Sequence, residues 1–150
     1  MAERGAFAVP TMATIFALMD EGAALGLPPV SLEKLERVAA AALESLDILH
    51  RAGVRMGLGT DLLGALHERQ TIEFELRARV LPPLEILRSA CQVNAELLGE
   101  VGRLGCVREG ALADLLVVDG DPLTDISVLG GHGERLAVVM SRSRLHKRTI

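Results

Sequence analysis

One carboxylate, Asp61, stands out because of the residues that precede it. The stretch from Gly53 to Asp61 is typical of a short strand with glycine at alternate positions. Because side chains alternate along a strand, Gly57, Gly59 and Asp61 share one face if the strand continues that far. The two glycines leave open space, and Asp61 would point into it. An acid above a small-residue face at a strand's C-terminal end is typical of a site on a parallel α/β sheet or barrel.

The alternative is structural: Asp61 only caps a turn or the next helix. His67 follows in the next loop and is a candidate to reach the same site, with no site role as its alternative. The other histidines show no HxH, HExxH or HxxxH spacing. We expect His50 on the surface of a helix, His132 in a glycine-rich loop and His146 in a basic tail.

Other polar motifs favour structural roles. Asp119-Gly120-Asp121-Pro122 offers two carboxylates to a cation, but Asp-Gly followed by Asp-Pro is more simply a turn after a strand. Asp114 precedes an apolar run and is expected to hydrogen-bond a neighbouring backbone group. Cys91 and Cys106 form no CxxC pair and are expected to be free thiols. The sequence contains no GxSxG, P-loop or GxGxxG motif.

Composition narrows the class of protein. The chain has 150 residues, 49% of them hydrophobic, which suffices for one domain with a core. A net charge of −4 and an aromatic content of 2% argue against a nucleic-acid partner. No apolar run reaches the ~18 residues of a membrane span, and no secretory leader is evident. The expectation is a cytoplasmic protein without membrane or nucleic-acid partners.

The elements that position Asp61 are predicted as a β-α-β unit. Ala6–Val9 is expected to be a buried strand, and Thr11–Leu25 a helix. Ser31 is a good N-cap for a second helix that ends near Ala52, where Gly53 supplies a helix C-terminal glycine. The strand that carries Asp61 follows directly.

The rest of the chain changes character near its midpoint. Glu68–Val80 has helical spacing, and a well-buried helix is expected from Pro83 to about Leu98. After Gly99, glycines punctuate the β-rich runs Leu115–Val118 and Leu136–Met140. We therefore expect two parts, residues 1–98 and a β-rich subdomain of residues 99–150.

Taken in order, four segments resemble the C-terminal part of a metal-dependent amidohydrolase, from the branch with imidazolonepropionase-like and prolidase-like enzymes. They are Val9-Pro10-Thr11, Ala52–Asp61 with its Gly-Thr-Asp ending, Ser89–Gly99, and Leu104–Leu123, which is similar to the family's "lG.i..G..ADlvv.d.dPl" pattern. Together they cover nearly the whole chain.

The resemblance implies a fold. Residues 1–98 would form about the last two β/α units of a (β/α)8 barrel, with strand seven near Val9 and strand eight ending at Asp61. Residues 99–150 would form the β-rich part of a small β-sandwich that is built from both chain ends. The expected fold class is α/β.

The resemblance also implies an activity, the hydrolysis of C–N bonds in amides or dipeptide-like substrates. One or two divalent metal ions, often zinc, would lie at the barrel mouth and lower the pKa of a bound water. Asp61 would contact the metal and act as general base and acid. Gly59 and Thr60 would shape its approach, and Thr60 and His67 would belong to a possible substrate loop.

The chain also departs from the family's pattern. It has no HxH pair, no candidate for the family's carboxylated lysine, and too few residues for a barrel, which needs ~250. We expect either a fragment of a longer enzyme or a truncated reading frame, inactive alone. The alternative is a non-catalytic module that associates with another chain through exposed edges at Val9, Val54 and Leu115–Val118.

Overall fold

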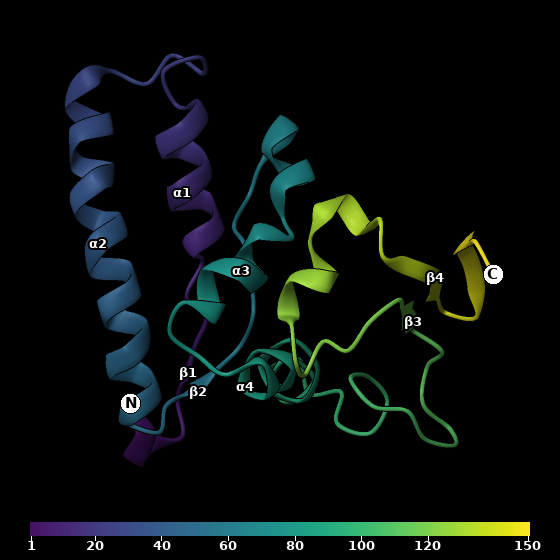
Figure 1. Ribbon diagram of the computed structural model, residues 1–150. Helices are drawn as coiled ribbons and strands as arrows, with labels where there is room; N and C mark the ends of the chain where they lie inside the picture. The colour runs from purple at the N-terminus through teal and green to yellow at the C-terminus, as the bar shows by residue number, and fades with distance from the viewer.

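The computed structural model describes residues 1–150 and contains two small sheets connected by helices (Figure 1). The strands are β1 (Phe7–Ala8), β2 (Arg55–Met56), β3 (Leu115–Val118), β4 (Leu136–Ser141) and β5 (Arg144–Arg148). The α-helices are α1 (Met12–Glu21), α2 (Pro29–Arg51), α3 (Ile72–Ala78), α4 (Pro83–Arg88) and α5 (Asn94–Leu97). Shorter 3₁₀-helices are η1 (Ala2–Arg4), η2 (Gly64–Arg69), η4 (Ile126–Leu129) and η5 (Gly131–Gly133), and η3 (Ser89–Val93) is a π-helix.

The first sheet is a parallel pair, β1 and β2, with Phe7 opposite Arg55 and Ala8 opposite Met56. Parallel strands need a long crossover connection, which α1 and α2 supply as a helical hairpin (Figure 1). The predicted order of strand, two helices and strand is confirmed. The strand predicted to reach Asp61 is shorter than expected, because the pairing ends where Pro10 removes a backbone donor.

Helix boundaries differ from the predictions where proline or glycine decides them. Helix α2 begins at Pro29 rather than after Ser31, because a proline is well suited to the first helical position and no side chain caps this end. Helix α1 ends at Glu21, before the predicted Leu25, and Gly22 bonds back to the carbonyl of Leu18.

Two longer predicted helices are broken. The segment predicted as one helix from Glu68 contains the end of η2 and then α3. The helix after Pro83 is divided into α4, η3 and α5, since a π-turn interrupts its regular bonding. It is also less buried than predicted, with Leu84 45% and Leu98 64% exposed.

The second sheet is antiparallel, in the order β3-β4-β5. Strands β3 and β4 match the predicted β-rich runs. The segment predicted as a basic tail forms strand β5 instead, so His146 lies on an edge strand. Asp114 accepts hydrogen bonds from the Arg142 amide at 2.6 Å and the Ser141 hydroxyl at 3.0 Å, which confirms its predicted role. Asp121 accepts from the Leu123 amide at 2.9 Å, and this confirms the predicted turn.

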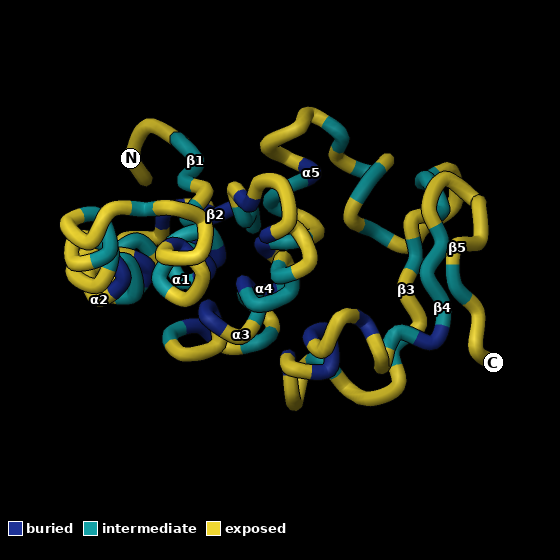
Figure 2. The backbone as a smooth tube through the Cα atoms, turned by 90° about the horizontal axis from the view of Figure 1, so that it is seen from above, coloured by how far each residue is buried: buried dark blue, intermediate teal, exposed yellow.

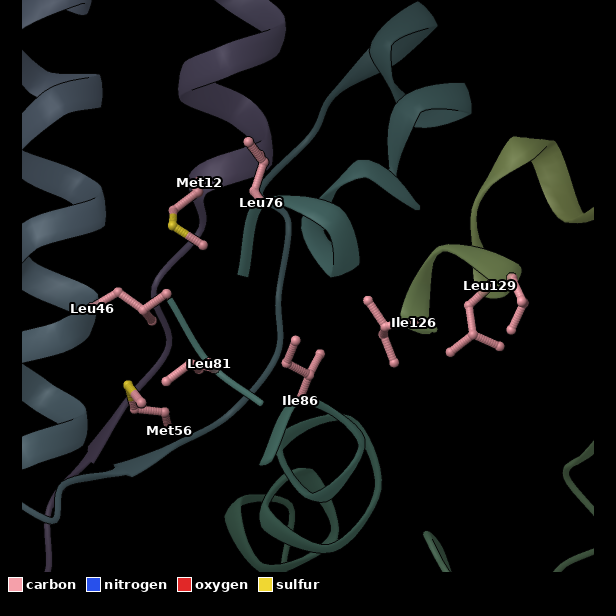
Figure 3. Close-up of a cluster of buried hydrophobic side chains, with 9 residues drawn as sticks. Met12, Leu46, Met56, Leu76, Leu81, Ile86, Ile126 and Leu129 are labelled. Carbon is pink, nitrogen blue, oxygen red and sulfur yellow. The ribbon is translucent and has the colours of Figure 1, made fainter. Parts of the chain in front are cut away.

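The main core lies between the α1–α2 hairpin, the parallel pair, and helices α3 and α4 (Figures 2 and 3). Its fully buried side chains include Met12, Leu46 and Ile86, and η4 adds Ile126 from the C-terminal part. Burial of each such side chain contributes about 1.5–3 kcal/mol. The core therefore fixes the end of β2 against α1, α2 and α4. The helices lack the combination of length and apolar composition that a membrane-spanning helix needs.

Candidate functional site

Asp61 lies in the segment that leaves β2, and its side chain is exposed. It forms no side-chain hydrogen bond or ion pair, and the cap position of the next helix, η2, is Leu63. The cap role considered for Asp61 is therefore not what the structure contains. Its φ angle is 52°, in the left-handed region that non-glycine residues seldom adopt. Such strained conformations cluster at functional sites.

The glycines before Asp61 serve close packing rather than leaving an open face. A Cβ atom on Gly57 would lie 2.6 Å from Oδ1 of Asn94, and one on Gly59 would lie 2.8 Å from Cγ1 of Val9. The prediction that Asp61 points into free space above these glycines was therefore wrong. The strand ends earlier, and neighbouring side chains occupy the space.

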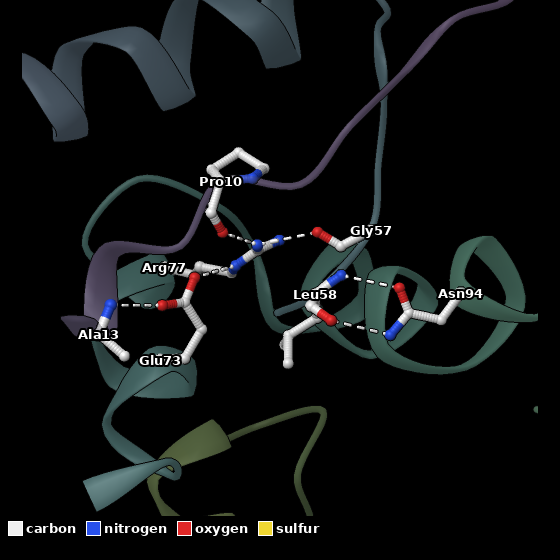
Figure 4. Close-up of polar contacts among 7 residues, drawn as sticks. All are labelled: Pro10, Ala13, Gly57, Leu58, Glu73, Arg77 and Asn94. Atoms are coloured by element: carbon white, nitrogen blue, oxygen red, sulfur yellow. Dashed lines mark hydrogen bonds and ion pairs between the residues drawn. The ribbon is translucent and has the colours of Figure 1, made fainter. Parts of the chain in front are cut away.

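A buried ion pair on α3 holds the ends of both strands (Figure 4). Arg77 Nε donates to Glu73 Oε1 at 2.7 Å, and both side chains are 0% exposed. Arg77 Nη2 donates to the carbonyl of Pro10 at 2.7 Å and to that of Gly57 at 2.9 Å. Glu73 Oε2 accepts from the Ala13 amide at 2.7 Å, in the first turn of α1. These contacts join α1, α3 and both strand ends.

The next peptide group is held from the opposite direction (Figure 4). The Asn94 side chain accepts from the Leu58 amide at 3.0 Å and donates to the Leu58 carbonyl at 2.9 Å. An amide side chain with this double contact replaces the peptide group of a neighbouring strand. The backbone just before Asp61 is therefore fixed at two successive residues.

Burial has an electrostatic cost at the ion pair. Desolvation by burial raises the pKa of the Glu73 carboxyl above its ordinary value of 4.5. The Arg77 guanidinium and the amides at the start of α1 lower this pKa by a smaller amount. Arg77 Nη1 is buried without an acceptor. The buried pair therefore stabilises the fold less than well-packed apolar side chains of similar size would.

The segment after Asp61 is anchored at its far end. Arg69 on η2 pairs with Asp20 at 2.6 Å and with Glu21 at 3.1 Å, at the end of α1. The Asp20 carboxylate, the largest influence, raises the pKa of Arg69 above its ordinary value. His67 lies on η2, exposed and without a side-chain hydrogen bond to Asp61.

Thr60 is half-buried beside Asp61. The remaining candidates are placed as surface features: His50 is exposed on α2, and His132 lies in η5 with a φ angle of 53°. Cys91 and Cys106 are free thiols, as predicted.

The chain does not by itself contain a metal centre. No group of three or more histidine, cysteine, aspartate or glutamate side chains converges closely enough to hold an ion. Asp61 is a single carboxylate, and a catalytic metal requires about three protein ligands. The residues present therefore do not fit a complete metal site.

Comparison with known proteins identifies the family. Residues 1–141 match the amidohydrolase family, and the chain belongs to it. This family is generally metal-dependent. The ochratoxinase of Aspergillus niger is 32% identical over 130 residues, which cover 85% of this chain and 27% of the relative.

Two solved structures are similar over almost the whole chain. A prolidase in complex with N-methylphosphonate-L-proline is 49% identical with a TM-score of 0.91, over 97% of this chain and 36% of that protein. A Xaa-Pro dipeptidase with methionine bound in its active site is 28% identical with a TM-score of 0.82, over 98% of this chain and 36% of that protein. The chain thus spans about a third of the length of these relatives.

Sequence reasoning missed Glu73 and Arg77 as site residues. Their signal was present: both lie on the helical stripe of Leu76 and Val80, so two opposite charges one turn apart interrupt an apolar face. Asn94 was noted only as part of a family resemblance, although an amide inside an apolar helix also indicates a buried partner.

Proposed function

We propose that this chain supplies the C-terminal part of an amidohydrolase that cleaves the C–N bond of Xaa-Pro or similar dipeptides. In this proposal β1 and β2 are the last two strands of a (β/α)8 barrel, and residues 99–150 belong to its small β-sandwich. The observation that carries the proposal is Asp61, exposed and unpaired in the segment that follows β2, with a φ angle of 52°.

Asp61 acts in this proposal as general base and then as general acid. Its carboxylate accepts a proton from the water that adds to the substrate's carbonyl carbon. It then gives that proton to the nitrogen as the C–N bond breaks, which leaves a carboxylic acid and an amine. No side chain of this chain competes for the carboxylate, so it is free to accept the proton.

The substrate class is supported by the ligand of one relative. In N-methylphosphonate-L-proline, the phosphorus is tetrahedral, as a peptide carbonyl carbon becomes when water adds to it. Tight binding of such analogues is expected of an active site complementary to the transition state. Because the prolidase with this ligand is 49% identical to the chain, we favour proline-containing dipeptides over other amides.

Apart from Asp61, the metal ligands of the proposed enzyme would come from residues outside these 150. Asp61 is the one acid in the segment between β2 and η2, and no other candidate ligand joins it. We therefore propose that the chain alone is inactive. Thr60 and His67 are proposed to line the substrate loop, so His67→Ala should raise KM and leave kcat nearly unchanged.

A hybrid enzyme tests this proposal. Residues 1–150 would replace the matching 36% of the prolidase that is 49% identical, and the hybrid would be assayed for release of proline from a Xaa-Pro dipeptide. We expect clear hydrolysis by the hybrid and none by either part alone. A hybrid that folds and binds metal but hydrolyses no dipeptide would contradict the proposal.

A further inference from the structure

The β1–β2 ladder lacks one donor that its register requires. The Gly57 amide donates to the Ala8 carbonyl at 2.9 Å, so the ladder continues past the paired residues. In a parallel ladder the next bond would run from the amide of residue 10 to the carbonyl of Gly57. Residue 10 is proline, which has no N–H. The Gly57 carbonyl would then be buried without a donor, which is unfavourable.

We infer that Arg77 takes the place of the backbone N–H that Pro10 removes, and that it thereby positions the segment that carries Asp61. Arg77 Nη2 lies 2.9 Å from the Gly57 carbonyl and 2.7 Å from the Pro10 carbonyl, so one nitrogen joins the ends of both strands. The inference rests on the proposed function only for the chemical role of Asp61.

The arginine is held rigidly enough for this role. Glu73 accepts from Arg77 Nε at 2.7 Å and from the Ala13 amide at 2.7 Å, so the guanidinium is tied to the start of α1. Neither side chain of the pair is exposed. An ordinary ion pair within a helix would direct its remaining donors to solvent, whereas Arg77 directs Nη2 to two strand carbonyls.

The residues between Gly57 and Asp61 are held in place, so fixing Gly57 also fixes the backbone near Asp61. Asn94 holds both the amide and the carbonyl of Leu58. Gly59 then fits against Val9, where even a Cβ atom would clash. With these residues fixed, little freedom remains for the backbone that places Asp61 in its left-handed conformation.

Restoring the missing N–H is the decisive experiment. The variants are Glu73→Gln/Arg77→Met, which removes both buried charges together, and the same pair with Pro10→Ala. The measurements on the 150-residue chain are the Cα and Cβ chemical shifts of Asp61 and the amide hydrogen exchange of Leu58 to Asp61.

We expect the double variant to change the Asp61 shifts and to speed exchange in this segment about tenfold. Adding Pro10→Ala should restore the shifts and most of the protection, with a newly protected amide at residue 10. Pro28→Ala, which changes a proline outside the ladder, should rescue nothing. Val128→Ala should lower stability without changing the Asp61 shifts, because it removes core packing on η4 in the C-terminal part.

If the double variant does not fold, Arg77→Lys serves instead, because lysine keeps a charge for Glu73 but lacks the planar set of donors. Pro10→Ala should again restore the Asp61 shifts. Unchanged shifts in every Arg77 variant, or no rescue by Pro10→Ala, would overturn the inference and leave Arg77 as a core ion pair.

Activity provides a separate readout in the hybrid enzyme. Arg77→Lys should lower kcat about tenfold and leave KM nearly unchanged, because it displaces the proton-transfer group and not the substrate. A hybrid that folds and binds metal but is inactive would contradict the proposed function and leave the spectroscopic result on Arg77 standing. An active hybrid with unaltered Asp61 shifts would contradict the Arg77 inference alone.

Discussion

Asp61 is exposed, has no hydrogen-bond or ion-pair partner, and has a φ angle of 52°. The first two properties mean that its side chain adds no stability, and the third lowers stability. The left-handed conformation alone costs roughly 1–2 kcal/mol for a residue with a Cβ atom. Aspartate tolerates it better than most residues. Asp61 bears this cost with no compensating side-chain contact in the chain, and this supports the role proposed for its carboxylate.

The backbone strain at Asp61 can be measured directly. Asp61→Gly should unfold with a free energy about 1 kcal/mol higher than Asp61→Ala, because glycine adopts positive φ without steric cost. Chemical denaturation of the two variants gives the difference. At Ala41, an exposed position within α2, the order should reverse, and Ala41→Gly should lose about 1 kcal/mol. Equal stabilities of Asp61→Gly and Asp61→Ala would show that position 61 is not held at positive φ.

Helix α3 shows how an element can serve a strand it does not adjoin in sequence. Its apolar stripe packs into the core through Leu76, while Glu73 and Arg77 on the same side reach the strand ends. This short helix therefore packs into the core and also holds the strand ends by hydrogen bonds. Removal of one partner from a buried pair of this kind costs about 3–5 kcal/mol.

The raised pKa of Glu73 predicts a pH dependence of stability. Below its ordinary pKa, folded and unfolded chains both hold the proton. As the pH rises, the unfolded chain releases this proton first, so this contribution to the free energy of unfolding falls until the pH exceeds the folded pKa. The stability of the wild type minus that of Glu73→Gln should therefore decrease with pH above about 4.

Denaturant unfolding at several pH values measures this difference. Glu75→Gln, an exposed change on the same helix, is the control for loss of one negative charge. A difference between wild type and Glu73→Gln that increases with pH would mean that pairing with Arg77 outweighs burial, and that the direction given for the pKa of Glu73 is wrong.

Elements defined by local patterns could be predicted from the sequence, and those defined by distant partners could not. Helix α2 and strand β3 follow from apolar spacing and glycine positions. Strand β5, in contrast, carries Arg144, Lys147 and Arg148, because charges protect an edge strand from unwanted pairing. The same charges made it resemble a tail.

The candidate site shows the same limit. The glycines and the acid before residue 62 indicated a candidate segment, but the contacts of Arg77 with Pro10 and Gly57 join parts of the chain that are far apart in sequence. Nothing in the local pattern specifies that the strand stops at Met56 or that Asp61 turns to positive φ. Both depend on packing between α1, α3 and the strand ends.

At the scale of the whole molecule, the two sheets lie toward opposite sides, with the chain ends far apart (Figures 1 and 2). Strand β3 is an edge strand and exposes Leu116 and Val117, and Val9 is 43% exposed beside β1. Val54, which was expected at an exposed edge, is buried. Exposed apolar edges of this kind favour association with other strands.

We therefore expect the chain alone to self-associate as its concentration rises, which light scattering coupled to gel filtration would detect. Leu116→Lys/Val117→Lys should reduce association, because charges on an edge strand oppose pairing. Ile48→Lys, at an exposed apolar position on α2, is the matched control and should have a smaller effect. A monodisperse, cooperatively melting monomer at every concentration would contradict this expectation and the view of the chain as an association module.

The turnover of Asp61→Asn in the hybrid enzyme tests most directly whether the Asp61 carboxylate transfers the proton in hydrolysis, as proposed. Asparagine keeps the size of the side chain and cannot accept the proton, so kcat should fall about 10²–10⁴-fold with folding unchanged. Asp47→Asn, at a half-buried position on α2 where Asp47 pairs with Arg51, should leave kcat as it is. If Asp61→Asn retained most of the activity of the hybrid, Asp61 would not be the catalytic acid and base.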